Sequence, residues 1–514
     1  MIALLRPAAA EPLDLAEVED VEALSLGDLL ERPVVAASRY EQAPGDSPTL
    51  VSTIDADHIE RFGYRTVGEA LGGLRGVYLS NDRGYSYLGV RGVSVPGDYN
   101  TRIALAIDNH RVNDAVYQQA TPGAELGLPM IAIDRIEMIR GGAWSVYGQS
   151  ALLGAIQIVT ATGASRPGLR VQSTTRATAE TFGDPARRSA LASRGEDLAA
   201  SYGAVSHGVD VFAAASYLFD PGLSAIYMPE LADPALTCVD DDARPRPCDG
   251  VVHGGDGEEA GSAYLALRSK RLAIHALASR RRKRVPTAAF GTLIDDPGTR
   301  TFDDRLYVDA EYHRRGDRSD VIARAAADYY GYTGDYVYDL PRPGYETLPA
   351  SRAVNHDFAR GLWLSTELRG RYKIPRLGAH LTDLELAGGG ELGVAAATQW
   401  NAYLLPEGDD VTLDRTDRTR IAGLSAQASA RGFGRVVGFA AIRGDYYPDS
   451  FGVTVNPQGG VVLDGGTAGR VRASIARGFR APNAYERYYE TGGQTSDDTL
   501  GPERSATSEL SYER

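Results

Sequence analysis

The chain contains 514 residues, more than one ordinary globular core accommodates, so two or more folded units are expected. A formal net charge of −14 argues against a nucleic-acid-binding surface. No uncharged apolar stretch approaches the roughly 18 residues of a transmembrane helix, although membrane-spanning β-strands leave no such stretch because they alternate apolar and polar residues. The 58 Gly, and 28 Tyr against 3 Trp, favour a turn-rich and mainly β chain.

The first residues predict an export signal whose beginning is missing. Residues 2–5 are too short for a secretory apolar core of about 7–15 residues, and Arg6 follows them at once. Three alanines at 8–10, just before Glu11, have the small side chains of a signal-cleavage site. Residues 11–31 contain eight acids and no base. We expect them to form an arm outside the folded units.

Residues 50–160 are expected to form one compact α/β unit. Thr66 and Glu69 have the spacing of a capping box and predict the start of a helix, which we expect to end at Gly76. The most informative stretch is 131–160, where two extended runs flank a glycine-rich turn. Closely placed glycines indicate tight backbone turns in a crowded place. The residues that mark this turn are Gly141, Tyr147, Gly148 and Gly154.

From residue 168 onward the pattern is a series of extended segments whose connections alternate between short and long. We count fourteen segments, near 168–182, 196–206, 207–219, 259–269, 270–284, 301–314, 318–334, 357–373, 379–397, 417–431, 434–448, 453–464, 469–481 and 505–514. The long connections are 220–258, 286–300, 335–356 and 398–416. Such alternation is typical of an antiparallel transmembrane β-barrel, with short turns at one end and long loops at the other.

Several stretches of the chain resemble TonB-dependent outer-membrane receptors. The 131–160 block is similar to the end of their plug domain, since RG at 140–141, YG at 147–148, Gly154 and IVT at 158–160 fit the family pattern. LGVRGV at 88–93 and RGFRAPN at 477–483 resemble further family motifs. The resemblance implies an arm over 1–49, a plug domain over 50–162 and the N-terminal part of a transmembrane barrel over 163–514, with about fourteen of the family's twenty-two strands.

The same resemblance implies two sets of site residues. The arm is expected to carry a TonB box, the segment that pairs as an added strand with TonB, although an ordinary first plug strand is the alternative. The box candidates are Val34, Val35, Ala36, Ala37 and Ser38. Plug arginines of the family pair with barrel carboxylates, which predicts a releasable latch here, while solvated surface arginines are the alternative. The latch residues are Arg91, Arg140, Glu503 and Glu509.

Other chemistry is sparse. Cys238 and Cys248 have a spacing that permits a disulfide, with two free thiols as the alternative, and one pair cannot make a zinc site. The eight histidines form no metal-binding motif, and no phosphate loop, nucleophile elbow or dinucleotide fingerprint is present, so we expect no metal, no cofactor and no enzyme. The basic run at 280–284 has lipopolysaccharide phosphates as a hypothetical ligand, and a solvated strand end is the alternative.

The size of the expected plug can be compared with that of a fourteen-strand barrel. A fourteen-strand barrel has a radius of roughly 15 Å, whereas a plug of about 115 residues has an outer radius of roughly 17 Å. We therefore expect the sequence to be an incomplete record of a longer protein that lacks both ends.

The expected function is TonB-dependent active uptake of a scarce substrate, such as a siderophore–iron complex or cobalamin, across the bacterial outer membrane. The expected partners are TonB with its inner-membrane energising complex, outer-membrane lipid and lipopolysaccharide, and the small-molecule or metal-chelate substrate. A non-functional fragment of such a receptor and a passive porin are the alternatives, and the sequence does not identify the substrate.

Overall fold

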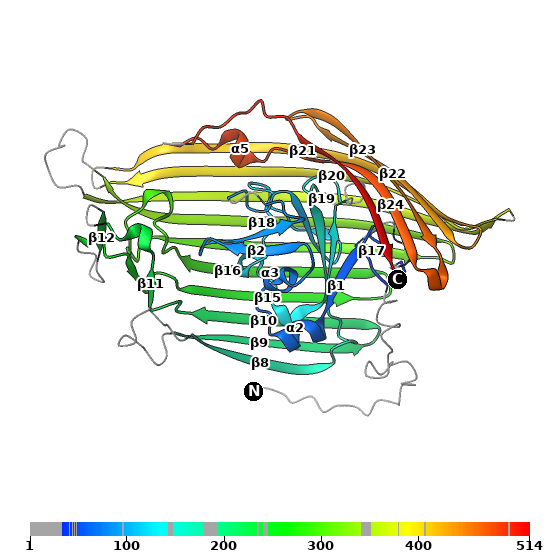
Figure 1. The fold of residues 1–514 in the computed structure, drawn as a ribbon, viewed down its shortest axis with the longest axis horizontal. Coiled ribbons are helices and arrows are strands. Elements are labelled where there is room, and N and C mark those ends of the chain that lie inside the picture. The colour runs from blue at the N-terminus through cyan, green and yellow to red at the C-terminus, as the bar shows by residue number, and fades with distance from the viewer. Residues whose placement is uncertain are drawn as a thin grey trace.

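The computed structural model describes residues 33–514 except 37, 41, 44, 46, 48, 95–96, 142–146, 179–192, 234–235, 240–244, 341–350, 379, 406–407 and 492–493. Two large sheets dominate it: a five-stranded sheet within a compact plug, and a fourteen-stranded antiparallel sheet that we call the wall (Figure 1). The predicted fold class, an α/β plug followed by antiparallel barrel-type strands, is confirmed. The expected arm over 11–31 lies outside the described residues. No helix among the described residues combines the length and the apolar character needed to cross a membrane.

The plug is built on a sheet with the order β1-β6-β7-β4-β5. Its strands are β1 (Val51–Asp55), β6 (Ile133–Arg140), β7 (Gly154–Thr160), β4 (Ile103–Ile107) and β5 (His110–Arg111). β4 and β7 pair in parallel, and the other neighbours are antiparallel. A separate hairpin and several short helices complete the unit: β2 (Val77–Asn81), β3 (Ser86–Val90), α2 (Ala56–Phe62), α3 (Val67–Gly72), η3 (Ala124–Leu126) and η4 (Met130–Ala132).

Helix α3 begins as predicted and ends earlier than predicted. The side chain of Thr66 accepts a hydrogen bond from the Glu69 N–H, which satisfies one of the free donors of the first turn. The helix ends at Gly72 and not at Gly76. The chain then turns at Gly76, whose φ of 72° is readily adopted only by glycine, and enters β2.

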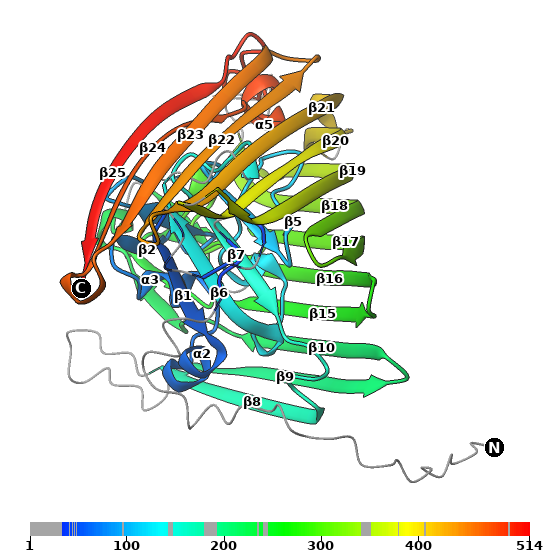
Figure 2. The same cartoon turned by 90° about the vertical axis from the view of Figure 1, so that its right-hand side faces the viewer.

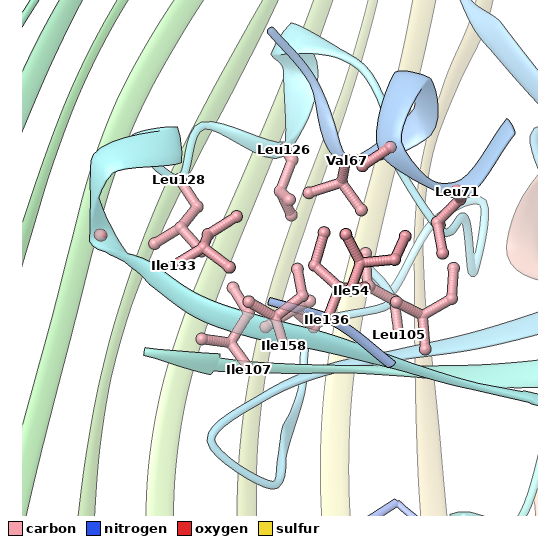
Figure 3. Close-up of a cluster of buried hydrophobic side chains, with 14 of the residues drawn as sticks. Ile54, Val67, Leu71, Leu105, Ile107, Leu126, Leu128, Ile133, Ile136 and Ile158 are labelled. Carbon is pink, nitrogen blue, oxygen red and sulfur yellow. The ribbon is translucent and has the colours of Figure 1, made fainter. Parts of the chain in front are cut away.

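The plug core forms between this helix and the sheet. Figure 3 shows Val67 and Leu71 of α3 facing Ile136 and Ile158 of the sheet. Each of these four side chains is no more than 1% exposed. Burying an aliphatic side chain of this size contributes about 1.5–3 kcal/mol, so the apolar runs of β4, β6 and β7 stabilise the plug as a folded unit.

The wall contains fourteen strands in chain order, each antiparallel to the next, with β8 and β25 at its two edges. Figure 2 shows that it curves around the plug, which lies on the concave side. Its strands are β8 (Gly168–Thr178), β9 (Ser193–Ser206), β10 (Val209–Asp220), β15 (Glu258–Arg268), β16 (Leu272–Arg284), β17 (Arg300–Arg315), β18 (Ser319–Leu340), β19 (Ser351–Leu377), β20 (Leu381–Leu404), β21 (Asp410–Gly432), β22 (Val436–Tyr447), β23 (Gly452–Asp464), β24 (Arg470–Arg480) and β25 (Glu503–Glu513).

Several of the predicted long connections are partly structured. The β18–β19 ladder continues through residues 335–340 and 351–356, and β20 and β21 extend into 398–404 and 410–416, so these four strands are longer than predicted. The 220–258 connection contains two small two-stranded sheets. One pairs β11 (Ala225–Tyr227) with β14 (Val251–His253), and the other pairs β12 (Thr237–Val239) with β13 (Pro245–Pro247). Backbone hydrogen bonding in the four longer strands continues beyond the residues that alternate between apolar and polar. The alternation pattern therefore underestimates the length of the strands.

The two faces of the wall differ in chemistry. Along β17, Asp303, Arg305 and Tyr307 are buried against the plug, while Leu306 and Val308 are about half exposed on the opposite face. Successive strand residues point to opposite faces, so one strand supplies both surfaces. The inner face therefore presents charged and phenolic groups to the plug.

Candidate functional site

The 131–160 stretch positions one carboxylate within the plug sheet. Glu137 lies in β6 between Thr53 of β1 and Gln157 of β7, and it is fully buried. A buried carboxylate needs charged or hydrogen-bonding partners. Arg135 Nε donates to Glu137 Oε1 at 2.7 Å and supplies one of them.

The other partners of Glu137 come from the N-terminal segment 33–42. The backbone N–H groups of Val35 and Ala36 both donate to Glu137 Oε2, at 2.8 and 2.7 Å. Val34 and Gln42 exchange two backbone hydrogen bonds, at 2.9 and 3.0 Å, which fold the segment into a one-bridge hairpin. The segment is therefore docked on the plug, and two of its N–H groups are occupied by a side chain.

The TonB-box candidates lie within this docked segment. Val34, Ala36 and Ser38 are 4%, 0% and 8% exposed, and Ala37 lies outside the described residues. Ala36 packs in a cluster of small side chains with Tyr147, the tyrosine of the glycine-rich turn. The 131–160 stretch thus holds the segment twice, through Glu137 and through Tyr147.

A second hold on the segment comes from the wall. Arg39 Nη1 and Nη2 donate to the two carboxylate oxygens of Glu367 in β19, at 2.5 and 2.8 Å, and Nη2 also donates to the carbonyl of Asn109 at 2.7 Å. Arg369 Nη1 donates to the carbonyl of Arg39 at 3.1 Å. A two-pronged arginine–carboxylate pair has a defined geometry as well as a favourable charge. Residues 33–42 therefore bridge the plug and the wall.

Of the two arginines predicted for the latch, one pairs with the wall and the other does not. Arg91 Nη2 donates to Glu509 Oε2 at 2.7 Å, so this pair joins the plug to β25. Arg140 forms no ion pair with a described residue: it donates to Ser52 Oγ at 2.6 Å and to the carbonyl of Arg75, both in the plug. The interpretation of Arg140 as a barrel-pairing arginine is wrong, because the side chain turns toward β1 and the end of α3.

Arg102 forms the kind of ion pair with a wall carboxylate that we predicted for Arg140. Its guanidinium donates to both carboxylate oxygens of Glu503, at 2.9 and 2.7 Å. Glu503 also accepts from Arg480 of the wall at 2.7 Å. Arg102 precedes β4 and belongs to no motif in the sequence, so nothing in the sequence marked it for this role.

Further contacts along the plug–wall seam were also missed. His110 Nε2 lies 2.7 Å from Asp328 Oδ1, and both side chains are buried. Asp108 accepts from Arg268 at 3.3 Å. Burial alone would raise the pKa of Asp108, but His275 and Arg268 of the wall, with hydrogen bonds from Thr160, hold it below its usual range. The described residues contain no cluster of three or more His, Cys, Asp or Glu able to hold a metal ion.

The glycines of the plug turn are required by close packing. Gly141 and Gly148 have φ of 81° and 72°, and a Cβ on Gly148 would lie 2.9 Å from the guanidinium of Arg443 in the wall. A Cβ on Gly154 would lie 2.3 Å from the carbonyl oxygen of Ile139. These positions let β6, β7 and the wall approach one another.

At the loop end, the plug meets the wall through tyrosines. Tyr117 of the plug lies within 6.2 Å, centroid to centroid, of Tyr330 and Tyr332 of β18 and of Tyr485 in α5 (Ala484–Tyr488). Asn483 Nδ2 donates to the Tyr117 carbonyl at 2.8 Å, so the start of α5 contacts the plug. Phenol rings offer apolar faces and hydrogen-bonding tips to a bound molecule.

The two cysteines lie in the long 220–258 connection. Cys238 and Cys248 are joined by a disulfide across the β12–β13 hairpin. Their side chains pack with Val252 and Ile294 in a small apolar cluster of their own.

Family models match both units of the chain. A model described as the TonB-dependent receptor plug domain matches residues 43–155, and one described as a TonB-dependent-receptor-like β-barrel matches residues 260–513. The chain is similar to the iron-regulated outer membrane virulence protein of Vibrio cholerae, 32% identical over 132 residues, which is 25% of this chain and 20% of that protein. The vitamin B12 transporter BtuB of Vibrio cholerae is 30% identical over 143 residues, 27% of this chain and 22% of that protein. The matches thus span about a fifth of these curated relatives.

Solved structures show the same fold. The ferric enterobactin receptor PfeA of Pseudomonas aeruginosa has a TM-score of 0.62 and 16% identity, covering 91% of this chain and 69% of that chain. The siderophore receptor PirA of Acinetobacter baumannii has a TM-score of 0.62 and 15% identity, covering 90% and 67%. With its plug and its wall each matched by a family model and its fold shared with these receptors, the chain belongs to the TonB-dependent receptors of the bacterial outer membrane.

Proposed function

We propose that this chain acts in TonB-dependent uptake of a scarce substrate, such as a siderophore–iron complex or cobalamin, across the outer membrane. The names of its relatives support this class of substrate, since one is a vitamin B12 transporter and two structural neighbours are siderophore receptors. The proposed partners are TonB with its inner-membrane energising complex, the substrate, and surrounding lipid and lipopolysaccharide. Uptake makes and breaks no bond in the substrate, so the proposal assigns no enzymatic step and no cofactor.

The observation that carries the proposal is the docking of segment 33–42 between two carboxylates. Strand addition to a partner requires free backbone N–H and C=O groups. In the docked segment, the N–H groups of Val35 and Ala36 are taken by Glu137. Pairing with TonB at residues 34–38 therefore requires that Glu137 release them first. On this proposal, segment 33–42 makes a releasable contact with the plug and is not a permanent strand of it.

Movement of the plug would follow once the segment is free. The ion pairs Arg91–Glu509 and Arg102–Glu503 join the plug to the wall, and they are the contacts that a displaced plug must break. A passive porin is the less favoured alternative, because the plug occupies the concave side of the wall (Figure 2).

Uptake in cells tests the proposal. The chain is expressed in a strain that lacks its own siderophore and cobalamin receptors, and accumulation of radiolabelled iron–siderophore complexes and of labelled cobalamin is followed. We expect accumulation of at least one substrate in TonB-proficient cells and none above background in TonB-deficient cells. Equal accumulation in both strains would indicate a passive pore. Absence of accumulation of every substrate in TonB-proficient cells that display the protein in the outer membrane would overturn the proposal.

A further inference from the structure

The end of the wall opposite the long loops carries an uncompensated positive charge. Four consecutive short connections meet there: β15–β16, β17–β18, β19–β20 and β21–β22. Seven exposed cations on these connections and the adjoining strand ends form no ion pair with any described residue, and we call them the basic rim: Lys270, Arg271, Arg314, Arg315, Arg318, Arg376 and Arg435.

Acids near the basic rim do not neutralise it. Asp317 is the one acid within these four connections. Asp320 accepts from Arg371 at 2.8 Å, and Glu385 lies 3.5 Å from the same guanidinium, so both are occupied by an inward-facing cation outside the rim. Like charges gathered on one edge repel one another and attract a polyanion. The basic rim therefore fits an acidic, extended partner.

The chain itself contains such a polyanion, and it is attached at this end of the molecule. Residues 11–31 carry eight acids and no base: Glu11, Asp14, Glu17, Glu19, Asp20, Glu22, Asp28 and Glu31. Only Arg32 separates them from the docked segment 33–42. Ser38 and Gln42 of that segment line a cavity of about 410 Å³ together with Lys373 and Arg431 near the rim. Segment 33–42, which follows the acidic stretch in the chain, thus lies beside the basic rim.

The lengths are compatible. Twenty-one extended residues span up to roughly 70 Å. Eight neighbouring strands with a spacing of about 4.8 Å extend over roughly 34 Å. Residues 11–31 can therefore reach all four connections of the basic rim from residue 33.

We propose that the acidic stretch 11–31 binds the basic rim within the same molecule and thereby helps to keep segment 33–42 docked. Tethering raises the local concentration of the acids into the millimolar range, which gives them an advantage over free anions. Each exposed ion pair contributes little by itself, so the attachment is multiple, reversible and sensitive to salt. The restraint would act on the segment from its N-terminal side, independently of Glu137 and Glu367.

A distance measurement on the full chain tests this. Spin labels are attached to Ser25→Cys and Ser319→Cys in the purified protein in zwitterionic detergent, where the natural cysteines remain paired. At 10 mM salt, with a Debye length of about 30 Å, we expect a short and narrow distance distribution. At 1 M salt, with a Debye length of about 3 Å, the distribution should broaden and lengthen.

A matched pair of variants separates the basic rim from general charge. Arg315→Gln with Arg318→Gln removes two rim cations and should broaden the distribution already at 10 mM salt. Arg418→Gln with Arg504→Gln removes two exposed cations elsewhere on the wall and should leave it unchanged. A distribution that is broad in all three proteins at 10 mM salt overturns the proposal.

Anionic lipid headgroups are the competing occupant, because basic segments at a membrane surface attract them. The labelled protein is therefore also measured in nanodiscs with and without phosphatidylglycerol. A narrow distribution in both kinds of nanodisc supports binding of residues 11–31. A distribution that broadens when phosphatidylglycerol is present overturns it in favour of headgroup binding.

Discussion

Arg39 and Glu367 lie 328 residues apart in the sequence, yet two nitrogens of the Arg39 guanidinium contact the two carboxylate oxygens of Glu367 at 2.5 and 2.8 Å. This pair joins the N-terminal segment to the wall, whereas Glu137 joins the same segment to the plug. The two holds use different residues of the segment. They are therefore separable by single substitutions.

Glu137→Gln should loosen the plug hold. A neutral amide is a weaker acceptor than a carboxylate, and it removes one of the two carboxylates that pair with Arg135, at a cost of about 1–3 kcal/mol. We expect the exchange protection of the Val35 and Ala36 amides to fall by roughly 5- to 150-fold. Amide hydrogen exchange followed by mass spectrometry measures this. Glu60→Gln, on the exposed face of α2, is the control, and equal protection in the two variants would contradict the assignment.

Glu367→Gln should loosen the wall hold. Arg39, whose side chain is only 11% exposed, would lose its charged partner, which costs about 3 kcal/mol for a pair that is largely buried. The expected result is faster exchange at residues 38–42 with little change at Val35 and Ala36, because Glu137 remains in place. A uniform loss of protection over 33–42 would show that the two holds act as one unit.

Arg102 should matter more than Arg140 for the attachment of the plug to the wall. Arg102→Ala removes two hydrogen bonds to Glu503, which are worth about 1.5–3 kcal/mol when a charged group is involved. Arg140→Ala removes contacts within the plug only. A double-mutant cycle should give a coupling of about 1–2 kcal/mol for Arg102 with Glu503 and none for Arg140 with Glu503. Chemical unfolding of the wild type, the three single variants and the two double variants provides the free energies.

Gly154→Ala should destabilise the plug. The added methyl group would lie 2.3 Å from the Ile139 carbonyl oxygen, and a backbone atom cannot move aside without disturbing the β6–β7 ladder. We expect a loss of about 1–3 kcal/mol, seen as a lower calorimetric transition temperature. Gly501→Ala, where no atom lies within 4 Å of the new methyl group, should leave the transition unchanged.

The stability of the plug should fall as pH rises from about 4.5 to about 7. Burial raises the pKa of Glu125 in η3 from its usual 4.5 to about 7, so the folded state binds this proton more tightly than the unfolded state. The contribution of the protonated Glu125 carboxyl to the free energy of unfolding is fully present at low pH. It is lost as pH rises through the folded pKa, by up to about 3 kcal/mol. Glu125→Gln should remove this part of the pH dependence. Calorimetry at pH 5 and pH 8 on both proteins is the measurement, and parallel curves would contradict it.

Much of the fold was predictable because it depends on local pattern. The fourteen wall strands were located from alternation and short turns, and the turn at 206–208 between β9 and β10 is an example. Longer strands were underestimated where main-chain pairing continues without alternation, as between 335–340 and 351–356. The alternation of apolar and polar residues indicates which residues are extended. It does not indicate where the backbone pairing between two strands ends.

The site was less predictable because it depends on how two units are oriented. Arg91 and Arg140 have the same RG context, yet Arg91 reaches Glu509 and Arg140 turns back to Ser52. Arg102 pairs with Glu503 without any motif of its own. Which arginine faces the wall follows from the rotation of the plug relative to the strands, and the sequence around each residue does not encode that rotation.

The order of contacts along segment 33–42 has a mechanical consequence. A pull on its N-terminal side loads the Val34–Gln42 bridge first, then the two bonds to Glu137, and finally the Arg39–Glu367 pair. Contacts loaded one after another peel apart at a lower force than contacts loaded together in shear. The last contact in the series is anchored in the wall and not in the plug. A weak pull would therefore unfasten the segment one contact at a time, and the force would reach β1, the next strand along the chain, only after Arg39 has left the wall.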